Sequence, residues 1–593
     1  MPVWFGPEES PLFGALHVPD APTRALIVLC PPLGREYLSA HSTFLRLAVR
    51  LTQLGFAALR MDYRSTGDSF DRTGDGPGGD GSGAGGFVQD IGFAVDFVRT
   101  LGVVHVGILG MRLGANFAAV ECSLDPVDAL VLWDPCASGR AFLREQRTLG
   151  LVAGVRTPEE SGGDFELPGF RLSAEMTSEI LGVDLLTAPP GPLHEAELAG
   201  NVLLLTRAGR VADPKIAERL GRSPVEHREV AGQPALLDVH PLERAVPAEA
   251  LATVALWLDE VMPRSGRPVT LPARGEVKVR ICPGGPSSSE AEGDGVATIR
   301  ESAVSLGPVG LFAIETEPET GGRGPACIFV SVANDHRIGP GRLWVQLSRR
   351  LAASGFRCVR FDVNGFGDST ARSEGQVPAV LSVLGIDDVL DAARAVSPDD
   401  PGDVVLFGLS ASGYHILEAA LVLSPRGICL VNPMLVFRAP EMAAGGPMDD
   451  RRQFCLPRTA LAFAFATAAR EKSHVQWLDK RLRTLSSRLP KPLRKVVWRL
   501  RRGAAPVRNR PGERLGDLVG AGTDVLLICG PDEIQPFLET GLGAISRAEQ
   551  EGRLQIEVIP TLGHALLASK DRDVVSELIE DHVFARFRRA PAT

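Results

Sequence analysis

The sequence has no apolar run long enough to cross a membrane and no start typical of a secreted protein. A membrane-spanning helix needs about 18 or more consecutive apolar residues, and no such stretch occurs. The first residues show no charged start followed by an apolar core and a cleavage site. These absences predict a cytoplasmic protein.

Cysteine is scarce and shows no ligand spacing. The nine cysteines include Cys30, Cys327, Cys429 and Cys529, which stand in apolar runs typical of buried strands. Their spacing matches neither a metal site nor a disulfide framework, so we expect buried free thiols. The sequence therefore gives no reason to expect a metal or a redox cofactor.

The chain does contain a repeat. Residues 60–69, RMDYRSTGDS, recur at 360–369 as RFDVNGFGDS. Residues 131–135, VLWDP, recur at 429–433 as CLVNP. A repeat of this length indicates two tandem structural units.

Length and composition agree with two units. The 593 residues suffice for two cores. Short Val/Ile/Leu runs alternate with amphipathic stretches, which is typical of parallel sheets covered by helices. We therefore predict an α/β fold with tandem domains over 1–265 and 307–593, each a mostly parallel sheet with helices on both faces. The segment 266–306 is rich in Gly, Pro and Ser around 283–289 and is expected to be a linker, part of which can order against either domain.

The second half contains an apolar run that leads into a serine flanked by small residues. Val404–Phe407 is followed directly by GLSASG at 408–413, which places Ser410 at the apex of a strand-to-helix turn. Such a turn strains its central residue and leaves room only for small residues two positions to either side, here Gly408 and Ser412. Ser412 stands where the usual motif has glycine. The pattern fits a nucleophile elbow, and a purely structural turn is the alternative.

An acid and a base follow the serine at the ends of two later apolar runs. Asp532 and Glu533 follow a run that ends at Cys529, and His564 follows one that ends at Pro560. A nucleophilic serine needs a general base and an acid that orients the base. Asp532 is the predicted acid, and Glu533 is a nearby competitor. The alternatives are an ordinary turn residue and an ordinary loop histidine.

This order of serine, acid and histidine resembles the serine α/β-hydrolase superfamily. The resemblance covers the second half of the chain. It implies that Ser410 attacks an acyl carbonyl, that His564 acts first as base and then as acid, and that Asp532 orients the imidazole.

The resemblance also implies an oxyanion hole and a lid. The hole would use the backbone N–H of Ala411 and a second N–H from the loop after the apolar run at 327–330, donated by Ala333 or Asn334. The lid would be a helical insertion over about 434–520, where the second half is longer than the first.

The first half of the sequence lacks the serine, the acid and the histidine at the matching positions. Aligned on the repeat, Arg112 stands at the apex of its elbow, and Gly209 and Gln233 stand opposite Asp532 and His564. The first domain is therefore predicted to be a catalytically silent copy. Arg112 is either a structural replacement or a residue that binds an anion in the former pocket.

A strongly basic segment lies inside the expected lid. Residues 479–510 carry twelve basic side chains and one acidic side chain in a chain of net charge −9. A solvated pair of amphipathic lid helices would explain the pattern. So would a docking surface for an acyl carrier protein, a coenzyme A thioester or an anionic membrane surface. Nucleic acid is disfavoured, because no aromatic stacking platform accompanies the charge.

The resemblance implies a serine esterase, thioesterase or acyltransferase that works through an acyl-Ser410 intermediate. Hydrolysis and transfer to an alcohol or amine share the same first half-reaction, and natural-product or lipid metabolism would suit a basic lid that meets a carrier-bound chain. The alternative is a non-catalytic binding or scaffold protein built from two hydrolase-like domains. In both cases we expect the first domain to pair with the second within the chain.

Overall fold

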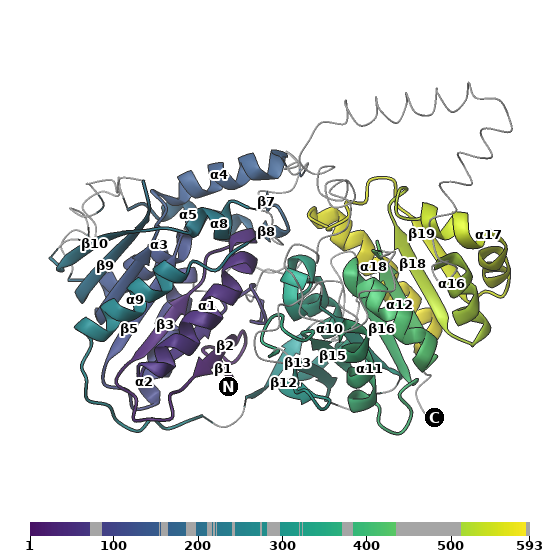
Figure 1. Ribbon diagram of the computed structural model, residues 1–593, viewed down its shortest axis with the longest axis horizontal. Helices are drawn as coiled ribbons and strands as arrows, with labels where there is room; N and C mark the ends of the chain where they lie inside the picture. Colours follow the sequence, from purple (N-terminus) through teal and green to yellow (C-terminus); the bar gives the residue numbers. More distant parts are fainter. Residues whose placement is uncertain are drawn as a thin grey trace, which may run out of the picture.

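The computed structural model shows two α/β units that lie side by side (Figure 1). It describes residues 1–71, 86–152, 155, 164–185, 197–209, 216, 220, 222–239, 244–272, 275–281, 297–319, 321–322, 324–331, 333–370, 384–434 and 511–588.

The N-terminal unit is built on an eight-stranded sheet with the strand order β1-β2-β4-β3-β5-β6-β9-β10. The pairs β1–β2 and β2–β4 are antiparallel, and every pair from β4 to β10 is parallel. In sheet order the strands are β1 (Pro2–Phe5), β2 (Leu12–His17), β4 (Ala57–Met61), β3 (Leu26–Cys30), β5 (Val106–Met111), β6 (Val127–Trp133), β9 (Ala199–Arg207) and β10 (Val225–Val230).

The C-terminal unit is built on a nine-stranded sheet with the strand order β11-β12-β13-β15-β14-β16-β17-β18-β19. The strands from β11 to β15 pair antiparallel, and every pair from β15 to β19 is parallel. In sheet order they are β11 (Glu276–Ile281), β12 (Ala297–Leu306), β13 (Leu311–Pro318), β15 (Cys358–Phe361), β14 (Ala326–Val330), β16 (Val404–Leu409), β17 (Gly427–Val431), β18 (Asp524–Cys529) and β19 (Leu554–Val558).

The two sheets share one topology. The order β2-β4-β3-β5-β6-β9-β10 in the first repeats as β13-β15-β14-β16-β17-β18-β19 in the second. The prediction of an α/β chain with two mostly parallel sheets is therefore confirmed. The segment 266–306 differs from the expected linker, because it contributes β11 and β12 to the second sheet.

Helices cover both faces of each sheet, because strand residues alternate between two apolar layers. In β14, Ile328 and Val330 face a layer with α11 and α12, whereas Cys327 and Phe329 face α10 and α18. The helices of the first unit are α1 (Arg35–Gln53), α2 (Phe87–Thr100), α3 (Leu113–Leu124), α4 (Gly139–Val152), α5 (Ala174–Gly182), α8 (Gln233–Leu237) and α9 (Ala248–Val261). Those of the second are η1 (Ala333–Ile338), η2 (Pro340–Arg342), α10 (Leu343–Ala353), α11 (Leu384–Val396), α12 (Ala411–Leu423), α16 (Pro511–Gly520), α17 (Gln535–Gln550) and α18 (Ser569–Phe587).

Most of the expected lid at about 434–520 lies outside the described residues. Its final part is α16, whose Leu515, Leu518 and Val519 are buried in the apolar layer that also contains residues of α12 and α17. The C-terminal end of the expected insertion is therefore part of the core of the second unit, because the apolar face of α16 packs in one of the helical layers that cover the sheet.

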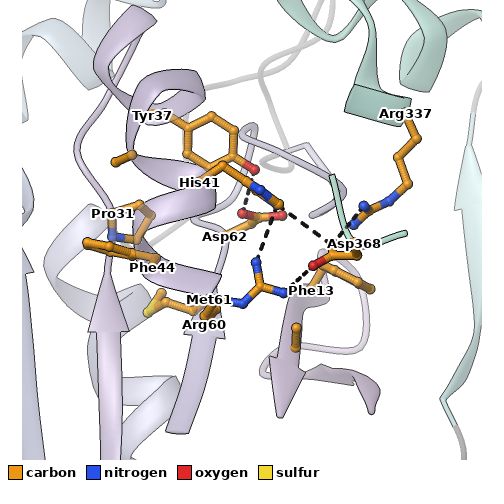
Figure 2. A pocket seen from close by; sticks show the side chains of 12 residues that line it. Phe13, Pro31, Tyr37, His41, Phe44, Arg60, Met61, Asp62, Arg337 and Asp368 are labelled. Atoms are coloured by element: carbon orange, nitrogen blue, oxygen red, sulfur yellow. Dashed lines mark hydrogen bonds and ion pairs between the residues drawn. The ribbon is translucent and has the colours of Figure 1, made fainter. Parts of the chain in front are cut away.

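The two units meet through buried ion pairs that repeat reciprocally. Arg360 Nη1 lies 2.5 Å from Asp68 Oδ1, and Arg60, at the position in the repeat that matches Arg360, pairs with Asp368, which matches Asp68. In Figure 2, Arg60 and His41 face Asp368 around a cavity of about 30 Å³. Reciprocal pairing of matching residues is the contact pattern of a two-fold dimer, here formed within one chain.

The described helices include none with the length and apolar character needed to span a membrane. The seven cysteines among the described residues are buried and unbridged, as the sequence predicts.

Candidate active site

Ser410 occupies a strained turn between β16 and α12. Its backbone adopts φ 54° and ψ −116°, in the region that non-glycine residues rarely enter. A Cβ added at Gly408 would lie 2.5 Å from the end of the Ile416 side chain and 3.0 Å from a backbone nitrogen, so the turn leaves little room for a side chain there. Ser412 replaces the usual glycine, and its hydroxyl accepts from the N–H of Leu409 at 3.0 Å and donates to the carbonyl of the same residue at 2.9 Å. The serine at position 412 therefore helps to hold the turn.

His564 meets the serine hydroxyl. Its Nε2 lies 3.0 Å from Ser410 Oγ, within hydrogen-bond distance. The strands β16, β17, β18 and β19 run parallel, so the loops at their carboxyl ends, including the one that carries His564, gather at one edge of the sheet. A serine and an imidazole separated by 154 residues in the sequence are thus brought together.

The acid that reaches the imidazole is Glu533, and this corrects the prediction of Asp532. Glu533 Oε1 lies 3.3 Å from His564 Nδ1, whereas the side chain of Asp532 is exposed on the turn after β18. The carboxylate of Glu533 folds back over Gly530, where an added Cβ would lie 2.5 Å from Oε2. The physical reason is the direction of the turn, which points residue 532 outward and residue 533 toward the sheet edge.

Electrostatics agree with this pairing. The hydrogen bond with His564 is the main cause that lowers the pKa of Glu533 below its usual value, against the opposing effect of partial burial. Glu533 is therefore a carboxylate at neutral pH. A carboxylate at Nδ1 favours the tautomer that is protonated there, which leaves Nε2 to accept the proton of the Ser410 hydroxyl.

The sequence reasoning missed Asn432, which links the loops that carry the acid and the histidine. Its Oδ1 accepts from the N–H of Gly530 at 2.9 Å, and its Nδ2 donates to the carbonyls of Gly563 and His564, each at 3.3 Å. Asn432 adopts φ 40°, and its counterpart Asp134 adopts φ 45°. The repeat of VLWDP and CLVNP is the signal that could have marked this position.

The predicted oxyanion donors lie at the same sheet edge. Ala411 is the first residue of α12, where backbone N–H groups have no acceptor within the helix. Ala333 and Asn334 begin η1 at the carboxyl end of β14, which pairs with β16. The assignment of Ala411 and of either Ala333 or Asn334 as backbone oxyanion donors stays a prediction.

The first unit has the same strained turn between β5 and α3, but its central residue, Arg112, belongs to a cluster of ion pairs. Arg112 adopts φ 55° and ψ −124°, close to the values of Ser410. It is 3% exposed and contacts three carboxylates, those of Glu36 at 3.1 Å, Asp134 at 3.3 Å and Glu145 at 2.7 Å. Three carboxylates around one guanidinium leave no positive field for an anion, which favours the structural interpretation of Arg112.

The other two counterparts of the triad also have structural partners. Gln233 donates to Asp134 Oδ2 at 2.5 Å and accepts from the indole N–H of Trp133 at 2.9 Å. Gly209 lies in a turn at φ 75°, and its N–H donates to Glu229 Oε2 at 3.3 Å. The catalytic silence of this unit stays a prediction.

Two further expectations from the sequence concern the basic segment 479–510 and metal ligands. The basic segment 479–510 lies outside the described residues. Within the parts of the chain that the structure describes, no group of three or more His, Cys, Asp and Glu side chains is arranged to hold a metal ion.

Comparison with known proteins finds a family model and a relative that are similar to parts of this chain. Residues 335–578 match the Alpha/beta hydrolase family. A protein named Bifunctional protein HldE from Rhodopseudomonas palustris (strain BisA53) is 26% identical over 362 residues, which cover 58% of this chain and 69% of that protein.

Two solved structures share a low level of similarity with the chain. Est1E from Butyrivibrio proteoclasticus is 16% identical with a TM-score of 0.30, over 44% of this chain and 96% of its own. XC6422 from Xanthomonas campestris, a serine hydrolase without lid, is 15% identical with a TM-score of 0.27, over 49% of this chain and 97% of its own. Similarities this low carry no argument about function. Residues 335–578, less than half of the chain, are thus similar to the Alpha/beta hydrolase family.

Proposed function

We propose that the C-terminal unit hydrolyses or transfers an ester- or thioester-linked acyl group through a covalent acyl-Ser410 intermediate. The observation that supports this proposal is the contact of 3.0 Å between Ser410 Oγ and His564 Nε2 at a strained elbow, with Glu533 on the far side of the imidazole. The similarity of residues 335–578 to the Alpha/beta hydrolase family supports the same proposal.

The reaction follows from the roles of these groups. His564 Nε2 takes the hydroxyl proton as Ser410 Oγ bonds to the acyl carbon, and the carbonyl oxygen becomes an oxyanion held by backbone N–H groups. When the tetrahedral intermediate collapses, the bond from carbon to the alcohol or thiol breaks, and His564 returns the proton to that leaving group. A water molecule, an alcohol or an amine then attacks the acyl-serine by the same sequence in reverse. Glu533 orients the imidazole and stabilises its cation throughout.

Covalent labelling tests the proposal. A serine-directed fluorophosphonate should add one adduct to the wild type and none to Ser410→Ala, because only an activated hydroxyl displaces the leaving group. Ser397→Ala is the matched control, since that hydroxyl donates to the carbonyl of Asp400 on an exposed turn and takes no part in the elbow. An unlabelled wild type with a normal unfolding transition would support the non-catalytic binding alternative.

The acyl group and its acceptor need a separate experiment. Intact-mass analysis after incubation with acyl thioesters and activated esters of graded chain length should give an acyl adduct on the wild type only. A preference for acyl-coenzyme A over the same acyl group on a short uncharged thiol would support an anionic carrier bound by the basic segment 479–510. Equal adduct formation would assign that segment to a solvated lid. Product analysis with added alcohols and amines separates hydrolysis from transfer.

A further inference from the structure

A hairpin of the first unit lies against the second. The strands β7 (Phe165–Leu167) and β8 (Phe170–Leu172) form a separate two-stranded sheet between α4 and α5. In Figure 1 this hairpin stands on the side of the N-terminal unit that faces the C-terminal unit. It belongs to the interval between β6 and β9, which matches the interval of the expected lid in the second unit.

The hairpin contacts the segment that follows the active-site histidine. The carboxylate of Glu166 accepts hydrogen bonds from both the backbone N–H of Ser569 and its hydroxyl, the latter at 2.7 Å. The N–H of Gly169 donates to the carbonyl of Leu567 at 2.8 Å. Glu166 is 9% exposed, so these bonds are largely shielded from water.

Glu166 supplies what α18 lacks in its own sequence. The residue at the N-terminal cap of this helix is Ala568, which has no side chain that can accept a hydrogen bond. Backbone N–H groups at a helix start need an acceptor, and a carboxylate there also interacts favourably with the helix dipole. The first unit therefore caps a helix of the second.

The segment between His564 and the start of α18 at Ser569 is short and irregular. The position of this segment therefore affects where the imidazole of His564 lies. Leu566 adopts φ 50°, which a leucine holds only under external constraint. Arg572 donates to the carbonyls of Leu566 and Leu567, each at 2.9 Å. These bonds come from the C-terminal unit, and the bonds from Glu166 and Gly169 complete the support from the other side.

We propose that the β7–β8 hairpin of the first unit is a positioning element of the active site, in which Glu166 and Gly169 fix the segment Leu567–Ser569 and thereby the imidazole of His564. The inference rests on the proposed function. Glu166 is a positioning residue, because it touches neither Ser410 nor His564. The first unit thus contributes to the reaction without any chemistry of its own.

The test compares Glu166→Ala with Asp164→Ala, in full-length protein. Asp164 lies on the same hairpin and pairs with Arg171 at 2.7 Å, so its loss changes the charge equally without removing a bond to Ser569. A misplaced catalytic group costs up to about a hundredfold in rate, so Glu166→Ala should lower kcat and the rate of fluorophosphonate labelling about ten- to a hundredfold, with KM nearly unchanged. Asp164→Ala should keep both kcat and the labelling rate within about twofold of the wild type, because it removes the pair with Arg171 and no bond to Ser569.

Two further variants separate positioning from charge and from general destabilisation. Glu166→Gln keeps an amide oxygen that accepts from Ser569 and should recover most of the rate. The double variant Glu166→Ala with Ser569→Ala should lose little more than Glu166→Ala alone, because the two side chains act through one bond. A Gln variant as slow as the Ala variant, or fully additive losses, would overturn the inference.

Hydrogen exchange distinguishes this inference from the proposed function. Amides of residues 563–569 should exchange faster in Glu166→Ala than in Asp164→Ala, whether or not a substrate is known. Equal exchange would refute the positioning role even in an active enzyme. A wild type that is never labelled, but whose exchange responds as expected, would refute the catalytic proposal alone.

Discussion

Replacement of Glu533 by glutamine is the sharpest test of the site, because it separates two adjacent carboxylates. Glu533→Gln removes the negative charge that lies 3.3 Å from His564 Nδ1 and keeps the volume of the side chain. Asp532→Asn is the matched control, with the same change of charge one residue earlier on an exposed side chain.

The magnitude follows from the geometry. A carboxylate at this distance stabilises an imidazolium by about 5 kcal/mol at an effective dielectric constant of about 20. The two side chains are 20% and 25% exposed, and water screening reduces this to about 3–4 kcal/mol. Because about 1.4 kcal/mol corresponds to a tenfold change in rate, kcat should fall about 10²- to 10³-fold in Glu533→Gln. Asp532→Asn should change kcat less than about twofold, since no charge is removed from the imidazole.

The assay is the rate of fluorophosphonate labelling, followed by kcat on the best ester from the substrate panel. Thermal unfolding of both variants shows that the fold is intact. A larger loss in Asp532→Asn than in Glu533→Gln would refute the assignment of Glu533 and restore the prediction made from the sequence.

Two further predictions concern the interface between the units. Asp68→Asn should lower the free energy of unfolding by about 3–5 kcal/mol, because Arg360 and Arg337 lose a buried partner. The control Asp259→Asn removes a partly exposed ion pair with Arg24 and should cost less than about 1 kcal/mol. Equal losses of the two variants in urea unfolding would contradict this prediction. Burial, and next the charge of Asp68, raise the pKa of Asp62 from its ordinary value of 3.8 to about 6. The folded state therefore binds more protons at this group, and the contribution of Asp62 to stability should fall as pH rises from about 4 to about 6. Asp62→Asn should lose that slope, and a stability difference from the wild type that stays constant between pH 4 and pH 7 would contradict the cause.

The division of labour between the two halves follows from the same elbow. In the second half the strained position holds Ser410, which meets a histidine, whereas in the first half it holds Arg112, which meets three carboxylates. The strain persists where no nucleophile remains, because the close packing of strand and helix requires the turn whatever the residue. Retention of an elbow is therefore evidence of the fold and not of the reaction.

The sequence predicted the strands, the elbow and the loops that form the site, because each depends mainly on residues close together in the chain or on the order of the strands. The alternation of apolar runs fixed the strands, because each run must bury both faces under helices. Small residues around Ser410 predicted the elbow, since only they fit where strand and helix approach. The order of serine, acid and histidine predicted which loops meet, because parallel strands bring their carboxyl ends to one edge.

Tertiary structure decided what depends on distant partners. The choice of Glu533 over Asp532 rests on the direction of one turn, and the role of Asn432 rests on two loops that it joins. The support of the His564 segment by Glu166 spans more than 400 positions of the chain. No local pattern encodes such contacts, because the free energy of a hydrogen bond between units depends on how the units dock and not on the neighbours of either residue.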